Sequence, residues 1–218
     1  MWLFRRAAKP DPSGVAADLP QNFGYKLCWV AVRSDDSQAV AKALELSGVK
    51  ASAWQEGIQS AYESSVFVTP SLQNWVLAAG IPFAPQEHIA ESVTSRVESL
   101  SRSFGEAQYF CTHRVVEFHV WARAVDGRLV RGFAYIGDQR ETPWNEGGQS
   151  TEEEDLGLEF FDADSPEASK PGYWDKNDLK YPNEGDVMRL AGAWSINPAT
   201  IEETFREPSL GLIGKLVR

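Results

Sequence analysis

The stretch 107–147, AQYFCTHRVVEFHVWARAVDGRLVRGFAYIGDQRETPWNEG, decides the fold. Two runs rich in β-forming residues, 115–124 and 129–136, lie on either side of the dipeptide Asp126-Gly127. Asp-Gly readily adopts the positive φ angles that a two-residue type I′ turn requires. The stretch therefore predicts a β-hairpin with a tight turn.

A two-residue turn also predicts which residues face each other across the hairpin. On the face expected to join the core, the opposed pairs are Ala124 with Leu129, Ala122 with Arg131, Val120 with Phe133, and Phe118 with Tyr135. The opposite face is expected to carry Glu117, His119, Trp121 and Arg123. On that face Trp121 would lie over Gly132, where an aromatic ring can cover the exposed backbone of a glycine.

Length and composition leave room for one large domain or two small ones. The chain has 218 residues, of which 43% are hydrophobic and eight are tryptophan, so it can bury a sizeable core. Because the formal net charge is −10, we do not expect a surface that binds the phosphates of a nucleic acid. No apolar run approaches the roughly 18–20 residues of a membrane span, and no apolar stretch follows Arg5 and Arg6 as in a signal peptide. We therefore expect a cytoplasmic protein.

The negative charge is unevenly distributed along the chain. Residues 1–137 contain 13 Lys/Arg and 13 Asp/Glu, whereas residues 138–207 contain 6 Lys/Arg and 18 Asp/Glu. The acidic excess therefore lies in the last third. Such a surface serves either solubility or the binding of a basic partner, and the charge pattern leaves both open.

The pattern of apolar and turn-forming residues predicts an α+β fold, with a mostly antiparallel sheet and packed helices. Besides the hairpin, strands are expected at 25–33, 65–69, 74–79 and 108–112, with further possible strands at 156–162 and 209–217. Helices are expected at 37–46, 87–104 and 186–194 and after Asn197-Pro198, and 51–63 is expected to be a short helical or irregular stretch. The expected domain division is a basic arm 1–22, an N-terminal α+β subdomain 23–84, and a C-terminal α+β subdomain 85–218 with an acidic excursion 138–182.

Residues that could carry chemistry are few. His113, Glu117 and His119 could share one strand face and form a two-histidine, one-carboxylate metal site. In an extended strand, however, His113 and His119 would lie about 20 Å apart, so we expect no metal site. Nucleophile-elbow, phosphate-loop and dinucleotide motifs are missing from the sequence, and we expect no catalytic residue and no cofactor. Cys28 and Cys111 are expected to be buried free thiols.

Five phrases together resemble an uncharacterised bacterial family encoded near polymorphic toxin and type VI secretion effector genes. They are GYKLCWVAVRSDD, AWQEGIQSAY, VFVTPSLQNWVLAAG, FAYIGDQRETPWNEGG and DVMRLAGAWSINPATIEE. Within that family the chain is similar to immunity proteins of type VI nuclease (DNase) effectors in pseudomonads. The resemblance covers about residues 24–206. It implies a cytoplasmic protein that takes part in bacterial competition by neutralising a cognate toxin, with no direct contact to nucleic acid or membrane.

Combined with the charge pattern, the resemblance predicts that the acidic region binds a basic nuclease domain. The expected toxin-binding residues are Asp138, Glu141, Trp144, Glu146, Glu152, Glu153, Glu154 and Asp155. Trp144 could alternatively fold back and cap the sheet. Another alternative is a small metal- or ligand-dependent enzyme that uses Glu117 and His119 on the polar face of the hairpin. A third is a scaffold protein without a toxin partner.

Overall fold

Nine strands form one antiparallel sheet, in the order β2-β9-β3-β4-β1-β5-β6-β7-β8, in the computed structural model. The structure describes residues 14–85, 87–137, 141–160, 162, 165–175 and 181–217. The strands are β1 (Cys28–Arg33), β2 (Leu46–Ser52), β3 (Val66–Val68), β4 (Trp75–Ala79), β5 (Glu106–His113), β6 (Phe118–Val125), β7 (Arg128–Ile136), β8 (Glu141–Glu146) and β9 (Gly211–Leu216). The predicted α+β class is confirmed.

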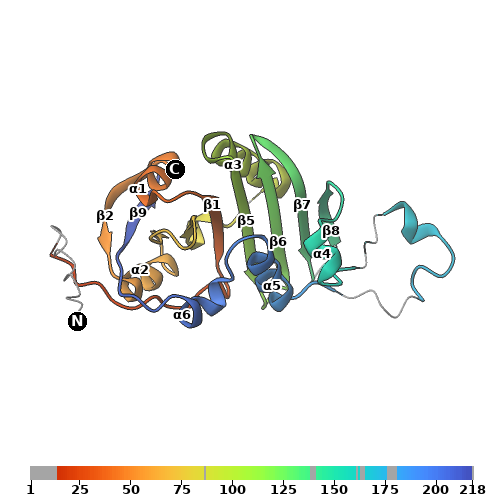
Figure 1. Ribbon diagram of the computed structural model, residues 1–218. Helices are drawn as coiled ribbons and strands as arrows, with labels where there is room; N and C mark the ends of the chain where they lie inside the picture. Colours follow the sequence, from red (N-terminus) through yellow and green to blue (C-terminus); the bar gives the residue numbers. More distant parts are fainter. Residues whose placement is uncertain are drawn as a thin grey trace, which may run out of the picture.

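Helices cover both faces of this sheet (Figure 1). One face packs against α1 (Ser37–Ala43), the 3₁₀ turn η1 (Ile81–Phe83) and α3 (Ile89–Phe104). The other packs against α2 (Trp54–Ala61), α4 (Thr151–Asp155), α5 (Glu184–Trp194) and α6 (Ile201–Thr204). The short turns η2 (Pro166–Ser169) and η3 (Pro198–Thr200) complete the described elements. Because both faces are covered, the hairpin is buried on both sides instead of one.

The long helix predicted at 87–104 is confirmed. In α3 the side chains of Val93, Val97 and Leu100 are buried, as their three- and four-residue spacing predicts. Gly105 ends the helix with φ 84°, a backbone conformation that glycine adopts without steric cost. Helix α1 begins after its N-cap Asp36, whose side chain accepts a hydrogen bond from the Ala39 amide.

Two strands, β2 and β8, were not predicted from the sequence, and both lie at the edges of the sheet. In β2, Gly48 has a positive φ and the register shifts between Ser47 and Lys50, which weakens the strand pattern. In β8, Pro143 lacks an amide donor and is tolerated because an edge strand pairs on one side. The possible strand at 156–162 does not form: among its described residues, Phe160 alone has strand pairing.

The register predicted for the hairpin is correct at the turn and wrong beyond it. Ala124 pairs with Leu129, but Arg123 then pairs with Arg131, which leaves Val130 as the extra residue of a β-bulge. A one-residue shift moves every following side chain of β7 to the opposite face of the sheet. Arg131 therefore lies on the face covered by α4 and α5, opposite Arg123 instead of Ala122.

The same shift corrects the predicted position of Trp121. Its partner is Phe133, with ring centroids 4.3 Å apart, and it does not lie over Gly132. Gly132 is covered instead by Trp144 of β8, whose ring occupies the space that a Cβ atom would need. Glycine at this position thus makes room for the tryptophan that caps the opposite face of the sheet.

The sheet continues across the expected subdomain boundary at residue 84. Strand β1 pairs with β5, and the C-terminal strand β9 lies between β2 and β3. Residues 85–218 therefore contribute strands to both halves of the sheet, and residues 23–84 form no separate sheet of their own.

The expectation of free thiols is wrong. Cys28 and Cys111 face each other across β1 and β5, with Cα atoms 4.0 Å apart, and form a disulfide. The bond joins positions 83 residues apart in the sequence, at the pair of strands that connects the N-terminal and C-terminal parts of the sheet. Closing so long a loop restricts the unfolded chain strongly.

We predict that breaking this disulfide destabilises the protein. The variant Cys28→Ser/Cys111→Ser should lose about 2–5 kcal/mol in free energy of unfolding, measured by urea denaturation without reductant. Thiol titration of the unreduced, unfolded wild-type chain should find no reactive thiol, whereas the reduced chain should give both. Two reactive thiols before reduction would contradict the bond.

Candidate functional site

The register of β5, β6 and β7 places side chains in rows across the face covered by α4 and α5. Cross-strand partners give a polar row, an aromatic row and a third row of mixed polarity. They are Gln108–Arg123–Arg131, Phe110–Trp121–Phe133 and Thr112–His119–Tyr135. Because of the bulge, two arginines stand side by side in the polar row, under the acidic segment that follows β8.

Arg131 and Glu153 form an almost completely buried ion pair. Their side chains are 5% and 1% exposed, and Arg131 Nε lies 3.0 Å from Glu153 Oε2 and 3.1 Å from Oε1. Arg131 Nη1 also donates to the Asn145 side chain and to the Glu146 carbonyl oxygen. Trp121 Nε1 donates to Glu153 Oε1 over 3.0 Å. These hydrogen bonds offset the cost of taking both charges out of water.

Helix α4 is positioned by a capping box. Ser150 Oγ accepts from the Glu153 amide, and Glu153 Oε2 accepts from the Ser150 amide at 2.8 Å. Trp194 Nε1 of α5 donates to the same Ser150 oxygen over 3.1 Å. The carboxylate of Glu153 therefore caps the N-terminus of α4 and also neutralises Arg131. Both contacts fix α4 on the sheet.

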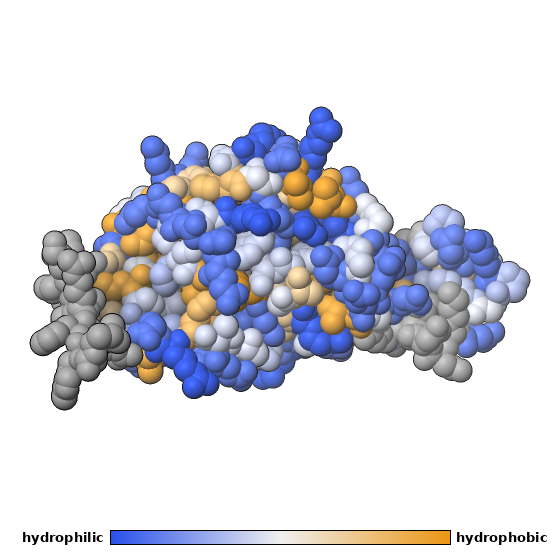
Figure 2. Space-filling view, viewed as in Figure 1, coloured by the Kyte–Doolittle hydropathy of each residue, from blue (hydrophilic) through white to orange (hydrophobic). Residues whose placement is uncertain are grey.

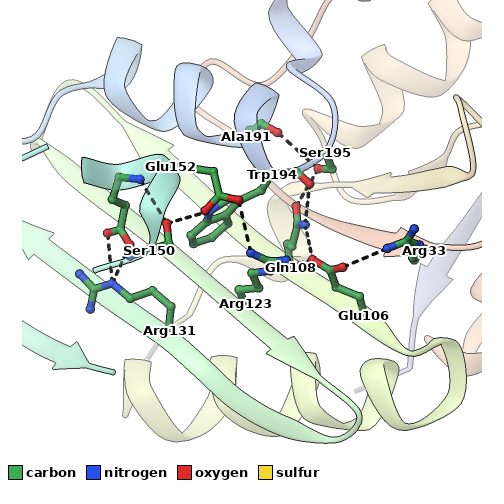
Figure 3. Close-up of polar contacts among 11 residues, drawn as sticks. Arg33, Glu106, Gln108, Arg123, Arg131, Ser150, Glu152, Ala191, Trp194 and Ser195 are labelled. Carbon is green, nitrogen blue, oxygen red and sulfur yellow. Dashed lines mark hydrogen bonds and ion pairs between the residues drawn. The ribbon is translucent and has the colours of Figure 1, made fainter. Parts of the chain in front are cut away.

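A second charged network lies next to this pair, at the C-terminal end of α5 (Figure 3). Glu106 accepts from Arg123 Nε at 2.7 Å and lies 3.5 Å from Arg33 Nη1. Arg123 Nη1 lies 3.7 Å from Glu152 Oε1 in α4. Gln108, fully buried, donates to both Glu106 and the Trp194 carbonyl oxygen. The two arginines of the polar row are thus paired with successive glutamates of α4.

The structure divides the predicted toxin-binding residues into two groups. Glu141, Glu146, Glu154 and Asp155 are exposed, and Glu152 is half-buried beside Arg123. Glu153 is buried in the ion pair and Trp144 is 5% exposed, so neither is available as a surface contact. Trp144 caps the sheet over Gly132, which is the alternative that the sequence left open. Asp138 lies outside the described residues.

His119 is the buried histidine of the third row. Its Nδ1 lies 2.9 Å from Thr112 Oγ1, and Asp186 at the start of α5 is its charged neighbour. Burial lowers the pKa of His119 to about 4, and the Asp186 carboxylate opposes this shift. The side chain is therefore neutral at pH 7.

The residues considered for a metal or enzyme site do not come together. His113 and Glu117 are exposed at the turn between β5 and β6, whereas His119 is buried under α5. Among the described residues, no group of three or more His, Cys, Asp or Glu side chains could hold a metal ion.

Two structural roles could have been found in the sequence. Residues 150–153, Ser-Thr-Glu-Glu, match the capping-box pattern of Ser/Thr followed three residues later by Glu, which predicts an inward-facing Glu153. Residues 183–186, Asn-Glu-Gly-Asp, have the same spacing, and Asn183 caps α5 reciprocally with Asp186. Arg131 gives no comparable signal, because its place depends on a bulge with no marker in the adjacent residues.

No family model, no curated protein and no solved structure matches this chain. Across the part of the chain that the structure describes, no helix combines the length and the apolar character needed to cross a membrane.

We predict that Glu153→Gln destabilises the protein by about 3–5 kcal/mol, because Arg131 is left buried without a counter-charge. Urea denaturation measures the change. The matched control is Glu154→Gln, an exposed neighbour in the same helix, which should change the free energy of unfolding by less than about 0.5 kcal/mol. Wild-type stability in Glu153→Gln would contradict the role of the pair.

We predict that His119 makes the protein less stable in acid. The unfolded chain takes up a proton near pH 6.5 and the folded protein near pH 4, so this contribution is complete above about pH 6.5 and is lost as the pH falls towards 4. The full loss is roughly 3 kcal/mol. The stability difference between wild type and His119→Gln, measured by urea denaturation from about pH 7 to pH 5, should shrink on acidification. A difference independent of pH would sink this assignment.

Proposed function

We propose that this protein is an immunity protein that binds and neutralises a cognate type VI secretion toxin, a basic nuclease, through the carboxylates at the β8–α4 end of the sheet. The observation that carries the proposal is the placement of Glu141, Glu146, Glu154 and Asp155, which are exposed on β8 and α4. In Figure 2 the surface around this end of the molecule is mainly hydrophilic.

The rigidity of this end supports a role in binding. Glu154 and Asp155 belong to a helix fixed by the Glu153–Arg131 pair, and β8 hydrogen-bonds to β7. Charges held on fixed elements lose little conformational freedom when a partner binds. A purely solubilising surface has no need of a buried ion pair to hold its carboxylates in place.

The sign of the charge supports the choice of partner. A nuclease presents cations around the groove that holds its phosphate backbone. A complementary acidic surface speeds association with such a protein and disfavours binding of nucleic acid itself. We therefore propose a protein partner, without direct contact to nucleic acid or membrane.

We place the complex in the cytoplasm, where a nuclease reaches DNA. Disulfides are uncommon in that compartment. The state of Cys28 and Cys111 in cells, measured by thiol trapping, therefore tests the location separately from the partner.

The test is to co-express the chain with any toxin-like protein encoded beside its gene and to measure survival, followed by calorimetry on the purified pair. The variant Glu141→Gln/Glu146→Gln/Glu154→Gln/Asp155→Asn should bind on the order of ten- to a hundredfold more weakly. Its affinity should also depend less on salt between about 50 mM and 200 mM.

The matched control neutralises the same number of exposed carboxylates elsewhere, in Glu45→Gln/Glu63→Gln/Glu87→Gln/Glu203→Gln. This variant should bind as the wild type does. Equal affinity of both variants would move the interface away from β8 and α4. Absence of protection and of binding to the neighbouring protein would remove the immunity proposal.

A further inference from the structure

A groove of about 310 Å³ opens between α1 and α3, on the face of the sheet opposite α4 and α5. Figure 1 shows α1 and β9 at one end of the molecule, and β8 and α4 towards the other. Arg96, Ser92, Ser95 and Ser99 of α3 line the groove, together with aliphatic side chains from α1, α3 and β9. The groove is therefore separate from the acidic surface of β8 and α4.

Arg96 is a half-buried arginine without a carboxylate partner. Among the arginines that the structure describes, Arg96, Arg123 and Arg131 are not exposed. Arg123 and Arg131 pair with glutamates, whereas Arg96 forms no ion pair within the described residues. Loss of hydration on burial lowers the pKa of Arg96, and no carboxylate opposes this shift. A charge partly removed from water in this way favours an anion in the groove.

The guanidinium group of Arg96 is held from one side by Phe83. Its Nη1 donates to the Phe83 carbonyl oxygen over 3.2 Å, and the same oxygen accepts from the Tyr109 hydroxyl at 2.9 Å. The Arg96 Cζ atom lies 5.0 Å from the centroid of the fully buried Phe83 ring. Within the described part of the chain, the other N–H groups of Arg96 make no hydrogen bond. These N–H groups are available to an occupant of the groove.

Two serine hydroxyls add donors beside Arg96. Ser95 and Ser99 are exposed, and their hydroxyls make no hydrogen bond with any residue that the structure describes. They lie four residues apart in α3 and therefore on the same side of the helix. The Ser92 hydroxyl already donates to the Ile89 carbonyl oxygen over 3.2 Å. The groove thus presents one guanidinium group and two unused hydroxyl donors to an anion.

We propose that this groove binds a small aliphatic monocarboxylate, with Arg96 as the residue that holds the carboxylate. A planar guanidinium group matches the two oxygens of a carboxylate. Ala43 and Leu216 line the groove and are not buried, so they offer an apolar contact to a short carbon chain. The inference does not depend on the proposed function, because no toxin takes part in this binding.

The remaining lining favours a small ligand with a single negative charge. Glu45, which is exposed, also lines the groove and opposes a second negative charge there. A phosphate dianion therefore fits this groove less well than a carboxylate. The volume lies at the lower end of the range of about 300–1,000 Å³ found for ligand sites, which matches a short carbon chain.

The test is an NMR titration of the isotope-labelled full chain with butyrate at constant ionic strength. Butyrate should shift the amide signals of Ser95, Arg96 and Leu216 in a saturable way, with a dissociation constant on the order of 10 mM. Shifts that do not saturate, or that avoid these residues, would overturn the site.

Three further probes check the chemistry of the ligand. Butyramide lacks the charge and inorganic phosphate lacks the carbon chain, so each should bind at least about fivefold more weakly than butyrate. Equal binding of butyramide would overturn the role of charge, and equal binding of phosphate would overturn the choice of a carboxylate. Acetyl-glutamate amide represents an acidic side chain of a protein. If it bound more tightly than butyrate, the choice of a free small acid would be wrong.

Variants of α3 separate binding from a purely structural role of Arg96. Arg96→Gln should abolish saturable butyrate binding, whereas Arg102→Gln, an exposed arginine in the same helix, should leave it unchanged. Unchanged binding in Arg96→Gln would contradict the proposal. Because Arg96 also contacts Phe83, Ser95→Ala/Ser99→Ala provides a second test at exposed positions. This variant should keep the wild-type amide spectrum outside the groove and bind butyrate about threefold more weakly, and wild-type affinity would overturn the site.

Discussion

The acidic end of this molecule depends on the buried contact between Arg131 and Glu153. A bulge at Val130 turns Arg131 towards the face that carries α4, and a capping box turns Glu153 towards Arg131. Neither charge could be buried alone, because an unpaired ion in the interior costs several kcal/mol. The register of β7 and the position of α4 therefore depend on each other, although Arg131 and Glu153 are 22 residues apart in the sequence.

This coupling gives neighbouring glutamates different roles. Glu153 points inward, Glu152 reaches Arg123 from the edge of the helix, and Glu154 and Asp155 remain at the surface. A helix of five residues is not stable by itself in water, so tertiary contacts must hold it. The position of the exposed carboxylates of α4 thus depends on the ion pair. Loss of the pair would displace Glu154 and Asp155 without any change in these residues themselves.

Local patterns in the sequence were sufficient for the α+β class, the Asp126-Gly127 turn and α3, because each depends on residues close together in the chain. They were insufficient where distant pairing decides the outcome. The bulge at Val130 is set by packing against β6 and α4, and the disulfide by the register between β1 and β5. For the candidate site, sequence located the exposed carboxylates but not the inward turn of Glu153, although the capping-box spacing was present.

The most direct measurement is amide hydrogen exchange of α4 in the unmodified protein. The amides of Glu154, Leu156 and Leu158 donate to backbone carbonyl oxygens within this segment. If the ion pair fixes α4 on the sheet, these amides should open with a free energy close to that of β6 and β7. Exchange at the rate of an unprotected loop, while β6 and β7 stay protected, would contradict a rigid acidic surface built on Arg131 and Glu153.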